Sequence, residues 1–328
     1  MTVKKVVYDH DDLVEKFSNL INDIQKFLDH YKIKTNVNIT KLASFLKALK
    51  DLNTNSDCND QQKANLYYLV IKFLQLQYFL DITNPRVRVK PDEIKKIICG
   101  KSNTNDSDQE YNGPFFEIST AVRFVKMTNA ETDINLDTDC DIILENEIAV
   151  ECKYIRSENR ISDNIEKAID QIDKRIEAGL AKKGIIAIDL SNLFDRENVI
   201  AFAKSILDRF IYHHEILNNQ GVHYGKFKDV KSIINANKGY SDIVGRYLQN
   251  EIEMVFLKAL SNKVDEKFQT SKHSVAITYE ASFGIGFEYN GQSVHFPIRC
   301  LSYYMNQNLS EHDNNYYKKF LHLLAVGM

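Results

Sequence analysis

The amino-acid sequence predicts an α/β protein that begins with a helical region. Between residues 11 and 82, apolar residues recur at steps of three and four, as one face of an α-helix requires. From residue 113 onward the pattern changes to helix, two short apolar runs, helix and a further apolar run. Near the end, Asn290-Gly291 separates two apolar and aromatic runs, which is a strong signal for a β-hairpin. Helices that alternate with short strands are typical of the α/β class.

The composition is that of a globular protein with a sizeable core. Of 328 residues, 44% are hydrophobic and 27% are charged, which indicates one large or two modest domains. The polar stretch KSNTNDSDQEYNG, residues 101 to 113, is expected to be an exposed loop or a joint between domains. We therefore predict a helical N-terminal region over 1–105 and an α/β domain over 106–328, which carries additional C-terminal helices and a β-hairpin.

Charge and cysteine usage narrow the class of protein. The start MTVKKVVYDHDD has no apolar leader, and no apolar run approaches the ~20 residues of a membrane span. Five cysteines without a C-x-x-C pair fit neither a disulfide framework nor a zinc finger, so we expect reduced thiols. A cytoplasmic protein with no membrane partner follows. Because the net charge is -3, a nucleic-acid partner would have to be held by local basic patches.

Helices are expected in both parts of the chain. Those of the N-terminal region correspond to LVEKFSNLINDIQKFLDHY, KLASFLKALKDL and NLYYLVIKFLQLQYFL. A polar loop precedes the last of them, and either Asn59 or Asp60 is expected to cap the helix. In the α/β part, helices are expected at GPFFEISTAVRFVKM, NIEKAIDQIDKRIEA, 197–218, 241–263 and YYKKFLHLLAV, and a strand at GIIAIDL.

The stretch CDIILENEIAVECKY, residues 140 to 154, is expected to form a β-hairpin. Both flanking runs favour strand, and Asn146 in the turn ENE tolerates a left-handed conformation. If residues 145–147 form the turn, Leu144 pairs with Ile148, and Asp141 lies directly opposite Glu151. By the same count, Cys140 and Cys152 are neighbours on the buried face, where we expect them to pack.

The polar face of this hairpin suggests a metal site. Glu151 and Lys153 are two residues apart and therefore point to the same side of the strand. The side chains of Asp141 and Glu151, on opposite strands, would lie roughly 4.5–5.5 Å apart at Cβ, so their carboxylates repel unless a cation lies between them. A divalent ion is the simplest occupant, and oxygen ligands favour Mg²⁺ or Mn²⁺ over zinc.

Asp141 followed by Glu151-Cys152-Lys153 on a hairpin resembles the core of the PD-(D/E)xK, or restriction-endonuclease-like, nuclease superfamily, over residues 114 to 190. Cys140 stands where the motif name has Pro. The resemblance implies a mixed central sheet flanked by helices. It also implies a Glu on the preceding helix and a polar residue, often Gln, on the following helix. Glu117, and Gln171 with Arg175, hold these places.

What the resemblance implies is a metal-dependent nuclease acting on DNA, of a restriction or defence type. Asp141, Glu151 and the Cys152 carbonyl would hold Mg²⁺ or Mn²⁺, with Glu117 as a further ligand. Lys153 would orient or deprotonate the attacking water. Gln171 and Arg175 would contact the phosphate backbone or the water. Additional DNA contacts are expected from a basic patch at Arg86, Arg88 and Lys90.

The literal motif PDEIK, residues 91 to 95, is interpreted differently. Pro91 suits the first turn of a helix, and Asp92 and Glu93 suit the positive end of the helix dipole. We expect these acids to cap a helix and not to take part in catalysis.

Other interpretations stay open from the sequence. Taken singly, Asp141 could end a strand, Glu151 and Lys153 could form a solvent-facing ion pair, and Gln171 could be a surface residue. The fold could also serve a catalytically silent binding module, or an effector gated by a regulatory protein that binds the N-terminal helices. Because NLYYLVIKFLQLQYFL is apolar around much of its circumference, and because cleavage of a duplex requires two hydrolyses, a homodimer is also expected.

Overall fold

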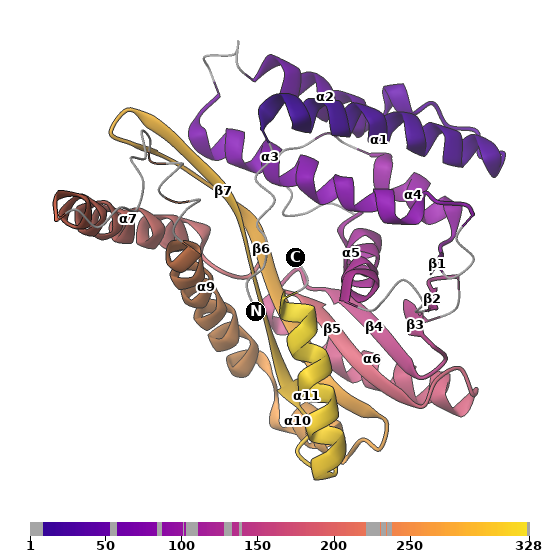
Figure 1. Cartoon of the computed structure of the whole chain (residues 1–328). Helices are drawn as coiled ribbons and strands as arrows, with labels where there is room; N and C mark the ends of the chain where they lie inside the picture. The colour runs from indigo at the N-terminus through magenta and orange to yellow at the C-terminus, as the bar shows by residue number, and fades with distance from the viewer. Residues whose placement is uncertain are drawn as a thin grey trace.

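The protein folds around one mixed sheet, which lies among its helices (Figure 1). The computed structural model describes residues 9–52, 58–83, 87–100, 102, 111–127, 133–137, 140–220, 230, 234 and 238–326. Its helices are α1 (His10–His30), α2 (Lys41–Asp51), α3 (Asp60–Leu74), α4 (Pro91–Ile98), α5 (Asn112–Met127), α6 (Ile161–Glu177), α7 (Arg196–Asn219), α9 (Lys238–Ala259), α10 (Asn262–Thr270) and α11 (Glu311–Val326). Its strands are β1 (Val87–Arg88), β2 (Ile134–Asn135), β3 (Ile142–Leu144), β4 (Ile148–Tyr154), β5 (Lys183–Asp189), β6 (Ser274–Tyr289) and β7 (Gln292–Met305).

The strands lie in the sheet in the order in which they occur in the chain. Strand β1 runs parallel to β2, and β2, β3 and β4 are antiparallel neighbours. Strands β4, β5 and β6 are parallel to one another, and β7 closes the sheet as the antiparallel partner of β6. The carboxyl ends of β4, β5 and β6 therefore meet at one end of the sheet, where ligands bind in many α/β folds.

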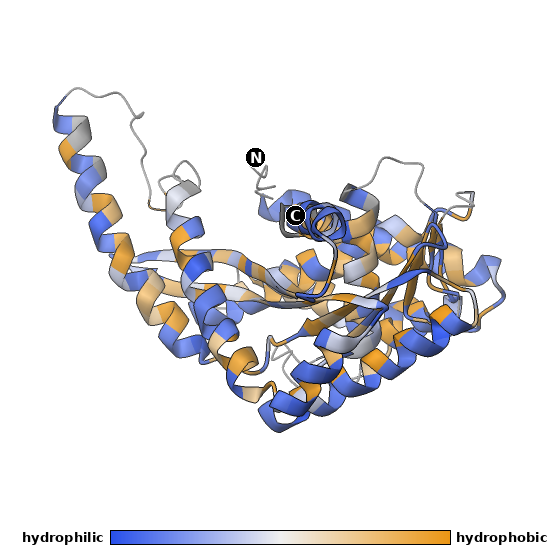
Figure 2. Ribbon diagram, turned by 90° about the horizontal axis from the view of Figure 1, so that it is seen from below, coloured by the Kyte–Doolittle hydropathy of each residue, from blue (hydrophilic) through white to orange (hydrophobic). Residues whose placement is uncertain are grey.

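Alternate residues of the central strands contribute to two apolar cores. Val150, Cys152 and Ala187 pack with the N-terminal helices, α5 and α11 on one face. Ile186 and Ile188 pack with α6, α7 and α9 on the other. Figure 2 shows this layering, with orange apolar residues on the strands and blue hydrophilic residues along the outer sides of the helices. The α/β class predicted from the sequence is confirmed.

Helix α3 joins the N-terminal region to the sheet. Its capping box is formed by Asn59 and Gln62, so of the two predicted candidates Asn59, and not Asp60, caps the helix. The side-chain amide of Gln61 then donates to the Gly284 carbonyl at 2.7 Å and accepts from the Gly286 amide at 2.9 Å. A single apolar cluster continues from the N-terminal helices into β4 and β5, so the predicted boundary at residue 105 does not separate two cores.

Most predicted elements are present, with differences at their ends. Asn290 and Gly291 have φ values of 49° and 74°, which confirms the predicted hairpin between β6 and β7. The helix expected over 241–263 ends at Ala259, and Ser261 caps a separate helix, α10. Strand β1 lies in the region expected to be all-helical, and most of the predicted joint at 101–113 lies outside the described residues. None of the helices described is long and apolar enough to cross a membrane.

Candidate active centre

The hairpin of β3 and β4 has the register that the sequence predicts. Leu144 pairs with Ile148, and Ile142 pairs with Val150. Glu145 and Asn146 occupy the left-handed region in the turn, with φ values of 52° and 53°. This conformation explains the preference for Asn in such turns.

Asp141, Glu151 and Lys153 come together at the carboxyl end of β4. The Lys153 ammonium lies 3.3 Å from Glu151 Oε2 and 4.0 Å from Asp141 Oδ2. Asp141 Oδ2 also accepts a hydrogen bond of 2.6 Å from the Cys152 amide, which holds the carboxylate against β4. The predicted acids and lysine therefore form one cluster, with Lys153 as a cation shared by the two carboxylates.

Cys140 departs from the prediction that it shares a face with Cys152. Residues 140 and 141 form a bend and do not continue β3, so the alternation of strand faces stops there. The Cys140 side chain packs with Ile143 and Ala149, whereas Cys152 belongs to the core on the opposite face. The Cys140 thiol donates to the Ile142 carbonyl at 3.4 Å, and burial and then the charge of Glu151 raise its pKa well above the usual range. No disulfide joins the five cysteines, all of which are described.

Glu117 approaches the same cluster from α5. Burial and then the negative charges of Asp141 and Glu93 raise the pKa of Glu117 to about 8. Burial and the charge of Asp141 also raise the pKa of Glu151 to about 7. The pKa of Asp141 is raised by burial as well, although Lys153 and the Cys152 amide oppose this. These carboxyl groups therefore share a buried region in which their charges repel one another.

The donor set of the cluster suits a hard divalent cation. Glu151 is fully buried, and its Oε1 has no hydrogen-bond partner. A buried carboxylate oxygen left in this way is costly unless a cation or a donor satisfies it. The surrounding ligands are carboxylates, which Mg²⁺ and Mn²⁺ prefer. Within the described residues, however, no three His, Cys, Asp or Glu side chains already stand close enough together to hold a metal.

The two residues predicted on the following helix differ in their surroundings. Arg175 of α6 is half-buried, and its positive charge partly opposes the rise that burial causes in the pKa of Asp141. Gln171 lies one turn earlier on α6 and is half-buried. It makes no hydrogen bond with the cluster in the part of the chain that the structure describes. The charge of Arg175 therefore acts on the acidic cluster, while the role of Gln171 stays a prediction.

The predicted basic patch is largely neutralised by nearby acids. Arg88 forms an ion pair of 2.7 Å with Asp133, and Lys90 lies 3.9 Å from Asp137. Arg86 lies outside the described residues. The contribution of this patch to DNA binding stays a prediction, and the acids beside it weaken its attraction for a polyanion.

The PDEIK stretch forms the first turns of α4, with Pro91 at its start and Asp92 and Glu93 in its first turn, as predicted. The predicted capping is not seen, because the N-cap residue is Lys90 and no side chain among the described residues makes a capping hydrogen bond there, while Glu93 pairs with Lys96 at 2.7 Å. The structure adds a relation that the sequence does not reveal, because the charge of Glu93 is among the causes that raise the pKa of Glu117. Glu93 therefore acts on the electrostatics of the centre from a neighbouring helix.

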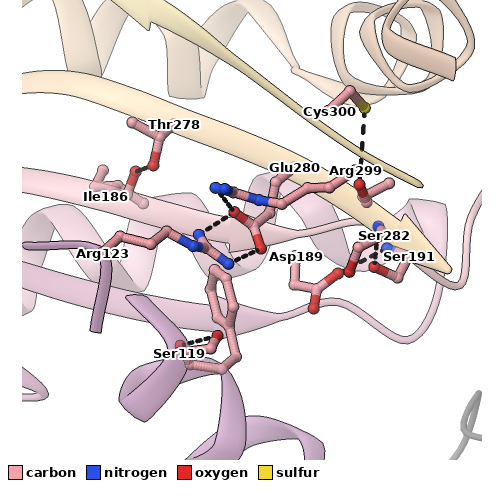
Figure 3. A network of polar contacts seen from close by, with 12 residues as sticks. Ser119, Arg123, Ile186, Asp189, Ser191, Thr278, Glu280, Ser282, Arg299 and Cys300 are labelled. Atoms are coloured by element: carbon pink, nitrogen blue, oxygen red, sulfur yellow. Dashed lines mark hydrogen bonds and ion pairs between the residues drawn. The ribbon is translucent and has the colours of Figure 1, made fainter. Parts of the chain in front are cut away.

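A buried ionic network, which no sequence pattern predicts, lies on the α5 side of the sheet. Arg123 of α5 and Arg299 of β7 both pair with Glu280 of β6 (Figure 3). Burial alone would raise the pKa of Glu280, but the charges of Arg123 and then Arg299 outweigh it and lower that pKa. Asp189 lies on the neighbouring strand in register with Glu280. Burial and the charge of Glu280 raise the pKa of Asp189 to about 6.

Comparisons with protein-family models, with curated proteins and with solved structures give no match for this chain.

Proposed function

We propose that the protein is a divalent-metal-dependent nuclease that hydrolyses DNA phosphodiester bonds at the cluster of Asp141, Glu151, Lys153 and Glu117. The observation that supports it most is the contact of one ammonium, Lys153, with the carboxylates of Asp141 and Glu151. Titratable groups with strongly shifted pKa values that gather at one point are typical of functional sites. The resemblance to the PD-(D/E)xK nucleases supplies the reaction class.

Each side chain has a role in this proposal. Asp141, Glu151, the Cys152 carbonyl and Glu117 would hold the cation. Bound Mg²⁺ or Mn²⁺ would polarise the scissile phosphate and lower the pKa of a coordinated water. The Lys153 ammonium would donate a hydrogen bond to the attacking water or to a phosphate oxygen and offset negative charge in the transition state. Arg175, whose charge partly opposes the rise in the pKa of Asp141, would orient the phosphate.

A binding module that has lost catalysis is the alternative. One observation favours it: Lys153 already compensates two of the acids, and the described residues contain no ready-made group of three metal ligands. An ion pair of this kind can be purely structural. Cleavage therefore has to be measured directly.

The test is incubation of supercoiled, linear and single-stranded DNA with the purified protein in Mg²⁺, in Mn²⁺ and in EDTA. We expect cleavage in either metal and none in EDTA. Lys153→Ala should lose cleavage, whereas Lys182→Ala, at an exposed ion pair with Glu147, should keep it. Binding of DNA without cleavage by the folded wild-type protein would favour the alternative, and equal activity of both lysine variants would remove Lys153 from the centre.

A further inference from the structure

A second polar pocket lies at the same end of the sheet as the acidic cluster but on the opposite face of β4. Tyr154 lines this pocket, while the preceding residue, Lys153, belongs to the cluster. In the register of the parallel strands, Tyr154 is opposite Asp189, and Asp189 is opposite Glu280. Residues of α3, β4, β6 and the segment from the end of β5 to the start of α7 line the pocket, among them Tyr68, Lys72, Tyr154, Asp189, Arg196 and Ser282.

Hydroxyl and amide groups hold the floor of the pocket in place. Asp189 Oδ1 accepts a hydrogen bond of 2.8 Å from the Ser191 amide, and the Ser191 hydroxyl accepts one of 3.0 Å from the Ser282 amide (Figure 3). The Tyr68 and Ser282 hydroxyls lie 2.7 Å apart and connect α3 with β6. Arg196, which also lines the pocket, donates to the Ser191 carbonyl at 3.1 Å. These contacts build the pocket from parts of the chain that are distant in sequence.

The formal charge of the pocket is positive. Lys72 and Arg196 each contribute one positive charge, against one negative charge from Asp189. Behind the pocket, the network of Arg123, Arg299 and Glu280 contributes two positive charges and one negative. The two positive charges that line the pocket favour an anion, because a low-dielectric surrounding strengthens the attraction. Burial and then, from within the network, the charge of Glu280 raise the pKa of the Asp189 carboxyl group.

The size of the pocket limits what that anion can be. The pocket is small and open on one side, with about 20 Å³ of space for water-sized groups, so the oxygens of a small group can enter it but a nucleobase or a sugar ring cannot. Asp189 at the floor is an acceptor, so a group that presents both negative oxygens and a proton donor is a better partner than a fully substituted phosphodiester. A phosphate monoester in its singly protonated form has both, since its second pKa is about 6.

We propose that this pocket binds the terminal phosphate of a phosphate monoester, with Lys72 and Arg196 contacting its oxygens and Asp189 accepting a hydrogen bond from its P–OH group. The source is either a mononucleotide or the phosphorylated end of a nucleic-acid strand, which share this chemistry. The inference does not depend on the nuclease proposal, because binding here uses none of the acidic cluster.

The test is isothermal titration calorimetry of the full-length protein in EDTA, which removes any metal-dependent binding at the acidic cluster. The probes are dAMP, inorganic phosphate, deoxyadenosine, and a short single strand with and without a 5′-phosphate. We expect binding of the phosphorylated probes and none of deoxyadenosine. Tighter binding of the phosphorylated strand than of dAMP would identify strand ends as the source, and the reverse would identify mononucleotides.

Variants distinguish binding in this pocket from general electrostatic attraction of an anion to the protein surface. Lys72→Met and Arg196→Gln should each weaken dAMP binding about tenfold or more, since each removes a charge-assisted hydrogen bond. Lys50→Met, at an exposed position of α2, removes the same charge and should bind like the wild type, as should Glu151→Gln. Lys72 also lies over the Phe115 ring, so thermal unfolding must show that its variant is folded, and Arg196→Gln provides the second test. Equal binding of dAMP and deoxyadenosine, no binding of any phosphorylated probe, or unchanged binding in the folded pocket variants would overturn the proposal.

Discussion

Glu151 is fully buried, and one of its carboxylate oxygens lacks a hydrogen-bond partner. Its folded pKa, about 7, lies above the ordinary value of 4.5 because of burial and then the charge of Asp141. A carboxyl group with a raised pKa stabilises the folded state only while it is protonated, so its contribution is lost as the pH rises through about 7. At pH 8 an ionised Glu151 therefore opposes folding when no metal is bound.

Glu151→Gln should abolish metal-dependent cleavage while the protein stays folded. Its thermal stability in EDTA at pH 8 should equal or exceed that of the wild type, because the variant removes a repelled charge. Calorimetry and a plasmid cleavage assay measure the two effects. Glu147→Gln, in the exposed turn of the same hairpin, is the matched control and should keep activity. If the Glu151→Gln variant were unfolded, Glu151 would instead be assigned to the structure of the hairpin.

The buried carboxyl group of Asp189, which lies outside the acidic cluster, should make the stability of the protein depend on pH. Its pKa is raised from 3.8 to about 6 by burial and then by Glu280, so the stability that it contributes is present below pH 3.8 and lost as the pH rises through about 6. Asp189→Asn, which keeps an acceptor for the Ser191 amide, should remove this loss. The free energy of unfolding of the variant, relative to the wild type, should rise by on the order of 3 kcal/mol between pH 4 and pH 8. A difference independent of pH in urea titrations would contradict it.

At the scale of elements, the contact of α3 with β6 depends on two glycines. A Cβ atom at Gly286 would lie 2.1 Å from the Asp60 carbonyl oxygen, and one at Gly284 would lie 2.4 Å from that of Ala64. The close approach also lets Gln61 pair with the backbone of β6 through both ends of its amide. Helix α3 is thereby held against the sheet by backbone contact as well as by apolar packing.

Gly286→Ala should destabilise the protein by about 1–3 kcal/mol or more, because the backbone of α3 would have to move away from β6. The matched control is Gly113→Ala in the first turn of α5, where an added Cβ meets nothing within 4 Å. That variant should be neutral or more stable by up to about 1 kcal/mol, as Ala favours helix over Gly. Urea unfolding of both variants checks the pair, and equal effects would show that the α3 contact is looser than described.

At the scale of the whole molecule, the apolar surface that led to the homodimer prediction is used within the chain. Leu66, Leu69, Val70 and Phe73 of α3 are buried in the core that α3 shares with α1, α2 and α5. From the sequence, part of this helix is expected to be buried against the catalytic domain or a second subunit, and a homodimer is expected. The chain itself covers these residues, so this apolar surface no longer favours a dimer.

We therefore expect a monomer, with a light-scattering mass near the 38.0 kDa of one chain. Under the proposed function, supercoiled plasmid should pass through a nicked intermediate, since one chain carries one Asp-Glu-Lys hairpin. A mass twice that of the chain would contradict this expectation. In that case Met254→Lys would test whether α9 lies at the interface between the two chains. Met254 is 69% exposed and lies with Ile243 and Leu257 among the exposed apolar residues of α9.

Local chain geometry was sufficient to predict the hairpin, its turn, and the approach of Asp141, Glu151 and Lys153. Strand alternation relates side chains that are two residues apart, and a short turn determines which residues pair across a hairpin. The turn at Asn290-Gly291 follows from equally local rules, which also narrowed the cap of α3 to Asn59 or Asp60. Each of these features depends on a few neighbouring residues, so the sequence by itself determined them.

Tertiary packing decided the features that join distant parts of the chain. The bend at Asp141 moved Cys140 to the face of Glu151, and the arrangement of α4 beside α5 brought the charge of Glu93 to bear on Glu117. The pairing of Arg123 with Glu280 required α5 to lie over β6. Electrostatic and apolar contacts of this kind have no period along the chain, because they depend on how complete elements pack against one another.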